Sequence, residues 1–268
     1  MAAMIRALIV DGQSNHDWAR TTAGIQRALA GLFDIEVATV TEPAMFTADF
    51  SPYQVVVSNY LGPDWPAATI TGLENYVRQG GGYVVVHAGG SSFPNRPSYN
   101  QMVGLAWRDA NHGYRVTLDA DGNIVRTPPG VGPGAGHGPC FSFPINHHAP
   151  QHPILRGLPA IWLHAKDELW HGLRGPAEEL TILASAFSPR TGAREPMMWT
   201  VGFGRGRVFV TVLGHVWPGG ETTAVDCVGF RATLARGCQW AATGAVTLPV
   251  PRNFPTEGEI SIGEAQER

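Results

Sequence analysis

The feature that most constrains the fold is a short apolar run, Tyr83 to Val86, that ends at a histidine. The run is rich in β-branched residues and follows Gly80 to Gly82, which is typical of a strand buried on both faces of a sheet. His87 comes next, followed by the small residues Ala88 to Gly90. Ligands in open α/β sheets bind beyond the carboxyl ends of the strands, so the sequence predicts a functional position for His87. The alternative interpretation is a buried histidine that hydrogen-bonds to a carbonyl group.

Strands and helices alternate through the first half of the chain. Apolar runs predict strands at 7–10, 35–40, 53–58 and 83–86, and apolar residues at helical spacing predict helices at 20–32 and 67–79. This order is typical of right-handed βαβ units around a parallel sheet. We therefore predict an α/β fold with a flavodoxin-like, doubly wound, mainly parallel sheet. Its switch point, between the first and third strands, would bring Asn15, His16 and Asn59 close to His87.

The second half of the chain predicts an antiparallel extension of this sheet and long inserted loops. We expect strands at 115–118, 181–186, 196–201 and 208–213, and helices at 99–105 and 225–242. The tight turn Gly202 to Gly206 would join two antiparallel strands. Pro128 to Gly138 is nearly all glycine, proline and small residues, so it predicts a long loop that serves function, subunit contact or surface wrapping. One domain is expected over residues 1–250, with an arm or disordered tail at 251–268.

Composition argues against several classes of partner and cofactor. The formal net charge is −3, and no basic stripe or bilayer-length apolar run is present, so neither nucleic acid nor a membrane is indicated. Glycine-rich dinucleotide and P-loop fingerprints are absent, which predicts no nucleotide cofactor. Cys140, Cys227 and Cys238 lack metal-ligand spacing, and the chain enters a first strand almost at once. These two observations predict a cytoplasmic protein with free thiols and no signal peptide.

Three histidines follow predicted strands and would meet at one edge of the sheet. His16 follows the first strand, His87 the fourth and His215 a late strand. Imidazole is the commonest metal ligand and the side chain best suited to proton transfer near neutral pH. We therefore predict that these three residues hold a divalent metal such as Zn or Mn, or bind substrate directly where no metal is present.

A second group of titratable residues lies in the middle of the chain. The spacing of His164, Asp167, Glu168 and His171 is compatible with one face of a helix, although it does not match the His-Glu-x-x-His zinc motif. We expect Asp167 or Glu168 to act as a general base together with His87. The competing interpretation is a solvated helix face or an ion-paired loop. Further histidines in this region are His137, His147, His148 and His152.

An ordered set of short motifs resembles the ThuA-like (trehalose utilisation) family over roughly residues 4 to 250. The set comprises Asn15-His16-Asp17-Trp18, the glycine-rich strand ending at His87, His152-Pro153-Ile154, Gly157-Leu158-Pro159, Asp167-Glu168-Leu169, Glu195-Pro196, Gly204 to Phe209 and Leu213-Gly214-His215. The chain departs from common members at Trp170-His171, where a tyrosine often follows the leucine. The resemblance implies the fold of class I glutamine amidotransferases. His87 stands near the position of their cysteine nucleophile, so the resemblance argues against glutaminase chemistry.

The resemblance also implies a role in the metabolism of sugars or keto-glycosides. Our leading hypothesis is an enzyme of isomerase, lyase or hydrolase type that acts on a glycoside or 3-keto sugar. A noncatalytic sugar-binding or regulatory module that keeps the fold without a nucleophile is the alternative. The expected partner is a small carbohydrate, and the sequence does not decide whether the chain forms a homo-oligomer. Candidate substrate-binding residues are Asn15, Trp18, Asn59, Tyr60, Glu195 and Trp217. The aromatic members of this set would stack on sugar rings, although tryptophans are more often core residues.

Overall fold

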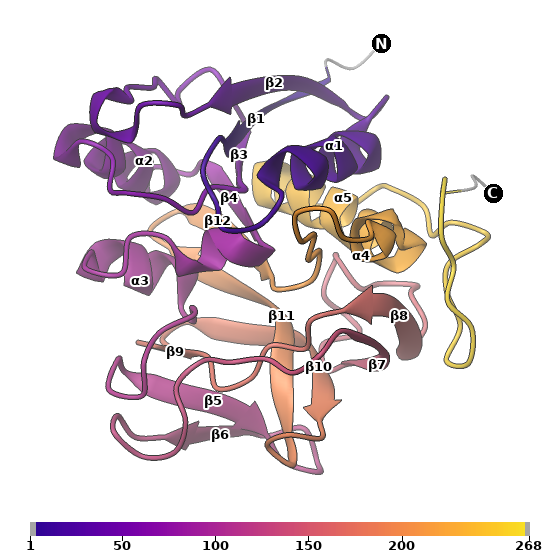
Figure 1. Ribbon diagram of the computed structural model, residues 1–268. Helices are drawn as coiled ribbons and strands as arrows, with labels where there is room; N and C mark the ends of the chain where they lie inside the picture. The colour runs from indigo at the N-terminus through magenta and orange to yellow at the C-terminus, as the bar shows by residue number, and fades with distance from the viewer. Residues whose placement is uncertain (1–3, 266–268) are drawn as a thin grey trace.

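A twelve-stranded mixed sheet runs through residues 4–265, the part of the chain that this computed structural model describes (Figure 1). The main path of the sheet has the strand order β2-β1-β3-β4-β12-β11-β10-β7-β8. In the first half the elements are β1 (Ile5–Asp11), α1 (Trp18–Leu29), β2 (Phe33–Thr39), the 3-10 turn η1 (Pro43–Met45), β3 (Val55–Ser58), α2 (Ala67–Arg78), β4 (Gly82–Val86), the 3-10 turn η2 (His87–Ser91) and α3 (Pro97–Val103).

The second half adds strands and the final helices. They are β5 (Tyr114–Leu118), β6 (Ile124–Thr127), β7 (Phe141–His147), β8 (Ile161–Asp167), β9 (Arg174–Gly175), β10 (Leu180–Ser188), β11 (Ala193–Phe203), β12 (Gly206–Thr211), α4 (Thr223–Asp226) and α5 (Val228–Thr243). Strands β5, β6 and β9 lie off the main path, with β5 paired to β11, β6 and β9.

The parallel half of the sheet is confirmed. β1 pairs in parallel with β2 and β3, and β4 pairs in parallel with β3 and β12. The apolar runs Val55–Val57 and Val84–Val86 are fully buried because helices cover both faces of these strands. Figure 1 shows α1 with α4 and α5 on one side of the sheet and α2 with α3 on the other. The predicted doubly wound α/β architecture is therefore correct.

Glycines on α5 allow that helix to lie directly on the sheet. A Cβ atom at Gly229 would stand 2.3 Å from the Trp162 ring, and one at Gly237 would stand 2.2 Å from the Phe209 ring. Both separations are too short for non-bonded carbon atoms. The two aromatic side chains thus occupy the space that side chains at these positions would need.

The antiparallel extension is also confirmed, with one correction. β12, β11, β10, β7 and β8 pair in antiparallel order, and the turn at Gly204 joins β11 to β12 with a positive φ of 61°. The helix-compatible interpretation of 164–171 is wrong, because His164 and Asp167 lie in strand β8. Trp162 and His164 are two positions apart on this strand, so both face inward. They lie opposite Ile145 and Phe143 of β7. Over so few residues the same positions are compatible with helical and with extended spacing. The pairing with β7 decides in favour of the strand.

The C-terminal segment lies against its own chain. Leu163 N–H donates to Thr256 O, and Val228 N–H donates to Ser261 O. The Phe254 ring packs edge-on against Trp162 at 5.5 Å. Residues 251–265 therefore form an ordered arm over β8 and the start of α5, and residues 266–268 of the predicted tail lie outside the described part. Between residues 4 and 265, no helix is both long enough and apolar enough to span a bilayer.

His147 makes a testable link between the fold and acid stability. Its Nε2 accepts a hydrogen bond from Trp162 Nε1 at 3.0 Å, which requires a neutral ring, and burial lowers its pKa from 6.5 to about 4. As the pH falls, the His147 ring is therefore protonated in the unfolded chain at a higher pH than in the folded chain. We expect the free energy of unfolding to decrease between pH 6.5 and about 4, with at most about 3 kcal/mol from this residue. Urea denaturation across this range should show a shallower pH dependence for His147→Gln than for the wild type. An unchanged slope would contradict this role.

Candidate functional site

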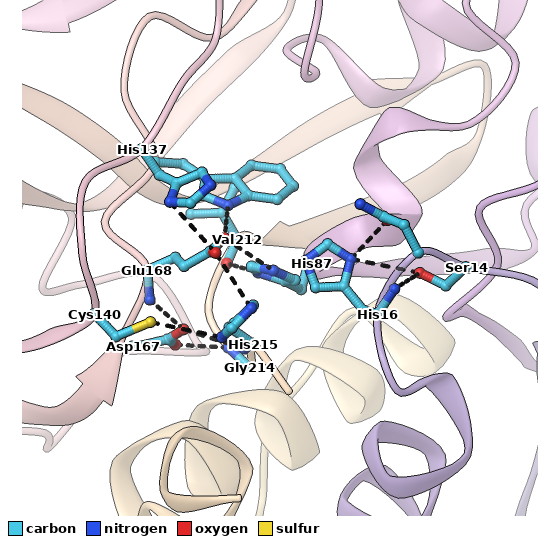
Figure 2. A network of polar contacts seen from close by, with 12 residues as sticks. Ser14, His16, His87, His137, Cys140, Asp167, Glu168, Val212, Gly214 and His215 are labelled. Atoms are coloured by element: carbon cyan, nitrogen blue, oxygen red, sulfur yellow. Dashed lines mark hydrogen bonds and ion pairs between the residues drawn. The ribbon is translucent and has the colours of Figure 1, made fainter. Parts of the chain in front are cut away.

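Four side chains converge at the carboxyl edge of the parallel strands. The candidate ligand atoms of His16, His87, Glu168 and His215 all lie within 4.8 Å of one another (Figure 2). The imidazole centroids are 4.9 Å apart for His16 and His87, 5.1 Å for His16 and His215, and 5.4 Å for His87 and His215. The structure thus brings together the three histidines that sequence reasoning placed at this edge.

The loops that carry these residues are joined by backbone contacts. Asp17 N–H donates to Val216 O at 2.8 Å, so the loop after β1 is bonded to the segment that follows His215. The Asp17 carboxylate in turn accepts from Arg20 N–H and caps α1. Helix α1 thereby fixes one end of the His16 loop, and the Val216 contact fixes it against its neighbour.

His87 occupies a strained turn directly after β4. Its φ of 43° is unusual for a residue with a side chain, and strain of this kind persists only where the surrounding structure enforces it. The ring is 2 % exposed, and Nδ1 donates to Val212 O at 2.6 Å. Because the carbonyl oxygen accepts, the proton lies on Nδ1. Nε2 is therefore the free lone pair, and it is buried without a hydrogen-bond partner in the described structure.

The other two histidines repeat this arrangement. His16 Nδ1 lies 2.8 Å from Asn15 Oδ1, and His215 Nδ1 lies 3.7 Å from Cys140 Sγ. His215 Nε2, which lies on the side of Glu168, is also buried without a hydrogen-bond partner among the described residues. Outer contacts that set the tautomer and orientation of an imidazole are typical of metal-ligating histidines.

Glu168 is the carboxylate that faces these rings. Oε1 lies 3.2 Å from His215 Nε2, and Oε2 lies 3.7 Å from His87 Nε2. Oε2 also accepts a hydrogen bond from Trp170 Nε1 at 3.0 Å, which holds the buried side chain in place. Trp170 therefore orients the carboxylate.

Burial and mutual repulsion disfavour a positive charge on the rings of His16 and His87. The pKa of His16 falls to about 3 because burial disfavours the charged ring and because His87 and His215 add repulsion. Burial also lowers the pKa of His87. Imidazole nitrogens that are buried beside a carboxylate without a hydrogen-bond partner suit a cation. The residues present therefore fit a divalent metal held by three nitrogens and one oxygen.

Asp167 has a structural role that differs from the predicted general base. Oδ2 accepts from His164 Nε2 at 2.7 Å and from Gly214 N–H at 2.8 Å, and Oδ1 accepts from Glu168 N–H at 2.7 Å and from His215 N–H at 3.1 Å. Both oxygens are thus already occupied by donors (Figure 2). Asp167 fixes the backbone beneath two members of the cluster and lies beside the centre rather than within it.

His164 is the charged partner of Asp167 in the core. Burial opposes a charge on its ring, but the thiol of Cys227 and the carboxylate of Asp167 outweigh that effect and raise the pKa of His164 to about 9. Burial likewise disfavours the Asp167 carboxylate, and His164 outweighs this to hold the pKa of Asp167 below its usual value. The pair is therefore ionised near neutral pH.

His137 joins the site although it was not among the predicted site residues. The Gly/Pro-rich loop places its Nδ1 3.3 Å from Glu168 Oε1. The side chain is 42 % exposed, in contrast to 7 % for Glu168, so it lies on the open side of the cluster. A histidine inside a long loop of small residues was the one sequence signal for this placement.

The predicted substrate-binding residues separate into two groups. Asn15 contacts His16, and Trp217 is 50 % exposed with its ring 5.5 Å from His16 and 6.2 Å from His215. These two residues border the centre. A cavity of about 420 Å³ opens beside Trp217 and His215. Its polar lining includes Cys140, Lys166, Glu221 and Thr223.

The structure places the remaining four predicted substrate-binding residues in supporting positions. Tyr60 is fully buried and donates to Pro63 O, and buried Asn59 donates to Trp18 O. Trp18 begins α1. Glu195 is fully buried and is ion-paired with Arg115. Proximity to a strand end or a motif did not distinguish these four side chains from those at the open edge.

Comparison with known proteins identifies the family. The ThuA family model, described as trehalose utilisation, matches residues 6–241, and the chain therefore belongs to this family. A crystal structure of a protein described as ThuA-like from Parabacteroides merdae is 37% identical, with a TM-score of 0.91 over 97% of this chain and 98% of that one. No curated protein matches the chain significantly.

More distant structures share the fold alone. A ThuA-like protein from Bacteroides uniformis is 16% identical with a TM-score of 0.61, and covers 92% of this chain and 95% of its own. A cytoplasmic protein from Salmonella typhimurium is 9% identical with a TM-score of 0.51, over 88% of this chain and 98% of its own. Family membership supports a role in sugar metabolism.

The contacts of Asp167 predict a large effect of its replacement. Asp167→Asn removes the charge that pairs with His164 and turns an amide donor toward backbone N–H groups. We expect a loss of about 3–5 kcal/mol in the free energy of unfolding, as for other broken buried pairs. Urea denaturation should be compared with Asp34→Asn, which alters an exposed ion pair with Arg6 and should change stability by less than about 0.5 kcal/mol. Equal stabilities for the two variants would refute this account.

Proposed function

We propose that this chain is a metal-dependent enzyme of sugar metabolism that acts on a glycoside or 3-keto sugar, with isomerase, lyase or hydrolase chemistry. The observation that carries the proposal is the pair of buried Nε2 atoms of His87 and His215, which face Glu168 with no hydrogen-bond partner in the described structure. Buried polar atoms are nearly always bonded. A divalent cation shared by these atoms would meet that requirement.

The donor set supports a borderline ion such as Zn or Mn. Imidazole nitrogens suit zinc and related ions, and a carboxylate oxygen adds negative charge that offsets the ion. The cysteine in contact with the cluster, Cys140, lies on the outer side of His215 at its Nδ1. The centre itself therefore offers nitrogen and oxygen ligands.

Such an ion would polarise a carbonyl or hydroxyl oxygen of the sugar, which favours loss of a neighbouring proton. Two observations support a role for Glu168: it lies among the three histidines, and the oxygens of the neighbouring Asp167 are occupied by donors. Glu168 serves there as a fourth ligand or as the general base. Trp217 offers an exposed aromatic face for the apolar side of a sugar ring.

The position of His87 argues against glutaminase chemistry. The strained turn after β4 carries an imidazole whose Nδ1 is bonded to Val212 O and whose Nε2 faces Glu168. A thiol nucleophile is absent from this position. The noncatalytic sugar-binding module is the competing proposal, and a cytoplasmic location and a homo-oligomer remain predictions.

Metal analysis tests the proposal directly. We expect one divalent ion per chain after incubation with Zn²⁺ or Mn²⁺ and dialysis, measured by elemental analysis. His87→Ala and His215→Ala should lose the ion, whereas His112→Ala should retain it, because His112 lies outside the cluster. At a free metal concentration of about 100 times Kd, the ion should add about 2.7 kcal/mol to the free energy of unfolding. A chain that binds no ion under these conditions would refute the metal centre.

A second measurement assigns the role of Glu168 and tests for catalysis. With a 3-keto glycoside as substrate, we expect turnover that a chelator abolishes and added metal restores. Glu168→Gln should lose the ion if the carboxylate is a ligand, or keep the ion and lose turnover if it is the base. Metal and sugar binding without turnover in the wild type would favour the noncatalytic module.

A further inference from the structure

A buried arginine holds the Gly/Pro-rich loop in place. Arg174 is fully buried, and its guanidinium donates to backbone carbonyls of the loop at Pro128 (3.1 Å), Val131 (2.5 Å) and Pro133 (2.8 Å). A buried charge is costly unless hydrogen bonds satisfy it. Here carbonyl oxygens of the loop accept most of the hydrogen bonds that the guanidinium donates. The buried charge of Arg174 therefore depends on this conformation of the loop.

Backbone pairing fastens the end of the same loop. Gly136 and His171 exchange two N–H to O contacts of 2.9 and 2.8 Å, and Ala135 N–H donates to Arg108 O at 2.9 Å. A Cβ atom at Gly136 would lie 2.9 Å from His171 Nε2, so glycine permits this close approach. The segment 128–138, here named the clasped loop, is thus bonded to the protein on both sides of Val131.

The clasped loop ends beside the candidate metal centre. His137 follows Gly136, and its Nδ1 lies 2.7 Å from Gly138 O and 3.3 Å from Glu168 Oε1. Since a carbonyl and a carboxylate only accept, the proton lies on Nδ1. Nε2 is then left as an acceptor on the ring that is 42 % exposed. The indole of Trp107, 5.8 Å from this ring, lies beside it.

We infer that His137 is a substrate-binding residue that accepts a hydrogen bond from a sugar hydroxyl at the centre, and that Arg174 is a positioning residue that holds the clasped loop for it. The inference rests on the proposed function. It explains why a loop with little regular structure is anchored by a buried charge. It also supplies an acceptor on the open side of a centre whose other rings face inward.

The experiment uses the full chain loaded with Co²⁺, with dihydroxyacetone as a hydroxyketone probe. Co²⁺ absorption reports both metal binding and the arrival of the probe. We expect His137→Ala to bind Co²⁺ within about twofold of the wild type and the probe about fivefold more weakly, as for one lost hydrogen bond. His137→Gln, which keeps an acceptor, should recover part of the affinity, and His112→Ala should match the wild type.

The role of Arg174 has its own variants. Arg174→Lys keeps the charge but loses the planar fork of donors, so we expect the same loss of probe affinity with unchanged Co²⁺ affinity. Hydrogen exchange should also become faster at residues 128–138. If Arg174→Lys fails to fold, the His137 variants still decide the inference.

The outcomes separate this inference from the proposed function. A wild-type chain that binds no Co²⁺ would refute the metal centre and the inference with it. Co²⁺ binding with no response to the probe, or equal probe affinity in the wild type and His137→Ala, would refute the role of His137 and leave the metal centre intact. Unchanged probe affinity and exchange in folded Arg174→Lys would refute the positioning role alone.

Discussion

The candidate site depends on the hydrogen bonds of one buried carboxylate. Asp167 ends β8, and its oxygens accept from the backbone of Glu168, Gly214 and His215 as well as from the ring of His164. These bonds join the end of an antiparallel strand to the loop that follows β12. The His215 imidazole and the Glu168 carboxylate are consequently held 3.2 Å apart. The raised pKa of His164 supplies the charge that makes a buried carboxylate tolerable there.

The centre is assembled at the boundary between two parts of one sheet. The parallel strands supply His16 after β1 and His87 after β4, and the antiparallel part supplies Glu168 after β8. β12 belongs to both parts, because it pairs in parallel with β4 and in antiparallel order with β11. The loop after β12 carries His215, so the strand that connects the two parts also contributes a member of the cluster.

The three imidazoles are each oriented by a contact at Nδ1. An acceptor or soft atom outside the cluster contacts Nδ1 in each ring, namely Asn15 Oδ1, Val212 O and Cys140 Sγ. Burial then removes water from the Nε2 side, which lowers the pKa of His16 and of His87. The result is a set of imidazole nitrogens beside a carboxylate, arranged before any ligand arrives. Such preorganisation reduces the free-energy cost of binding.

Sequence alone determined the parallel half of the fold and the edge of the sheet where the histidines gather. Continuous apolar runs and period-3.6 apolar patterns are local, and the rule that parallel strands end at one edge is general, so His16, His87 and His215 could be placed together. Short motifs added the family, which the match over residues 6–241 confirms.

Tertiary structure decided which side chains turn toward that edge. Asp167 and Glu168 are neighbours of the same chemical type, and only the pairing of β8 with β7 and the donors around Asp167 separate a structural carboxylate from one at the centre. The same holds for Tyr60 and Glu195, which face the core, and for His137, which Arg174 and the clasped loop bring in from outside the regular elements. These outcomes depend on contacts between residues distant in the chain, whose free energies no local pattern records.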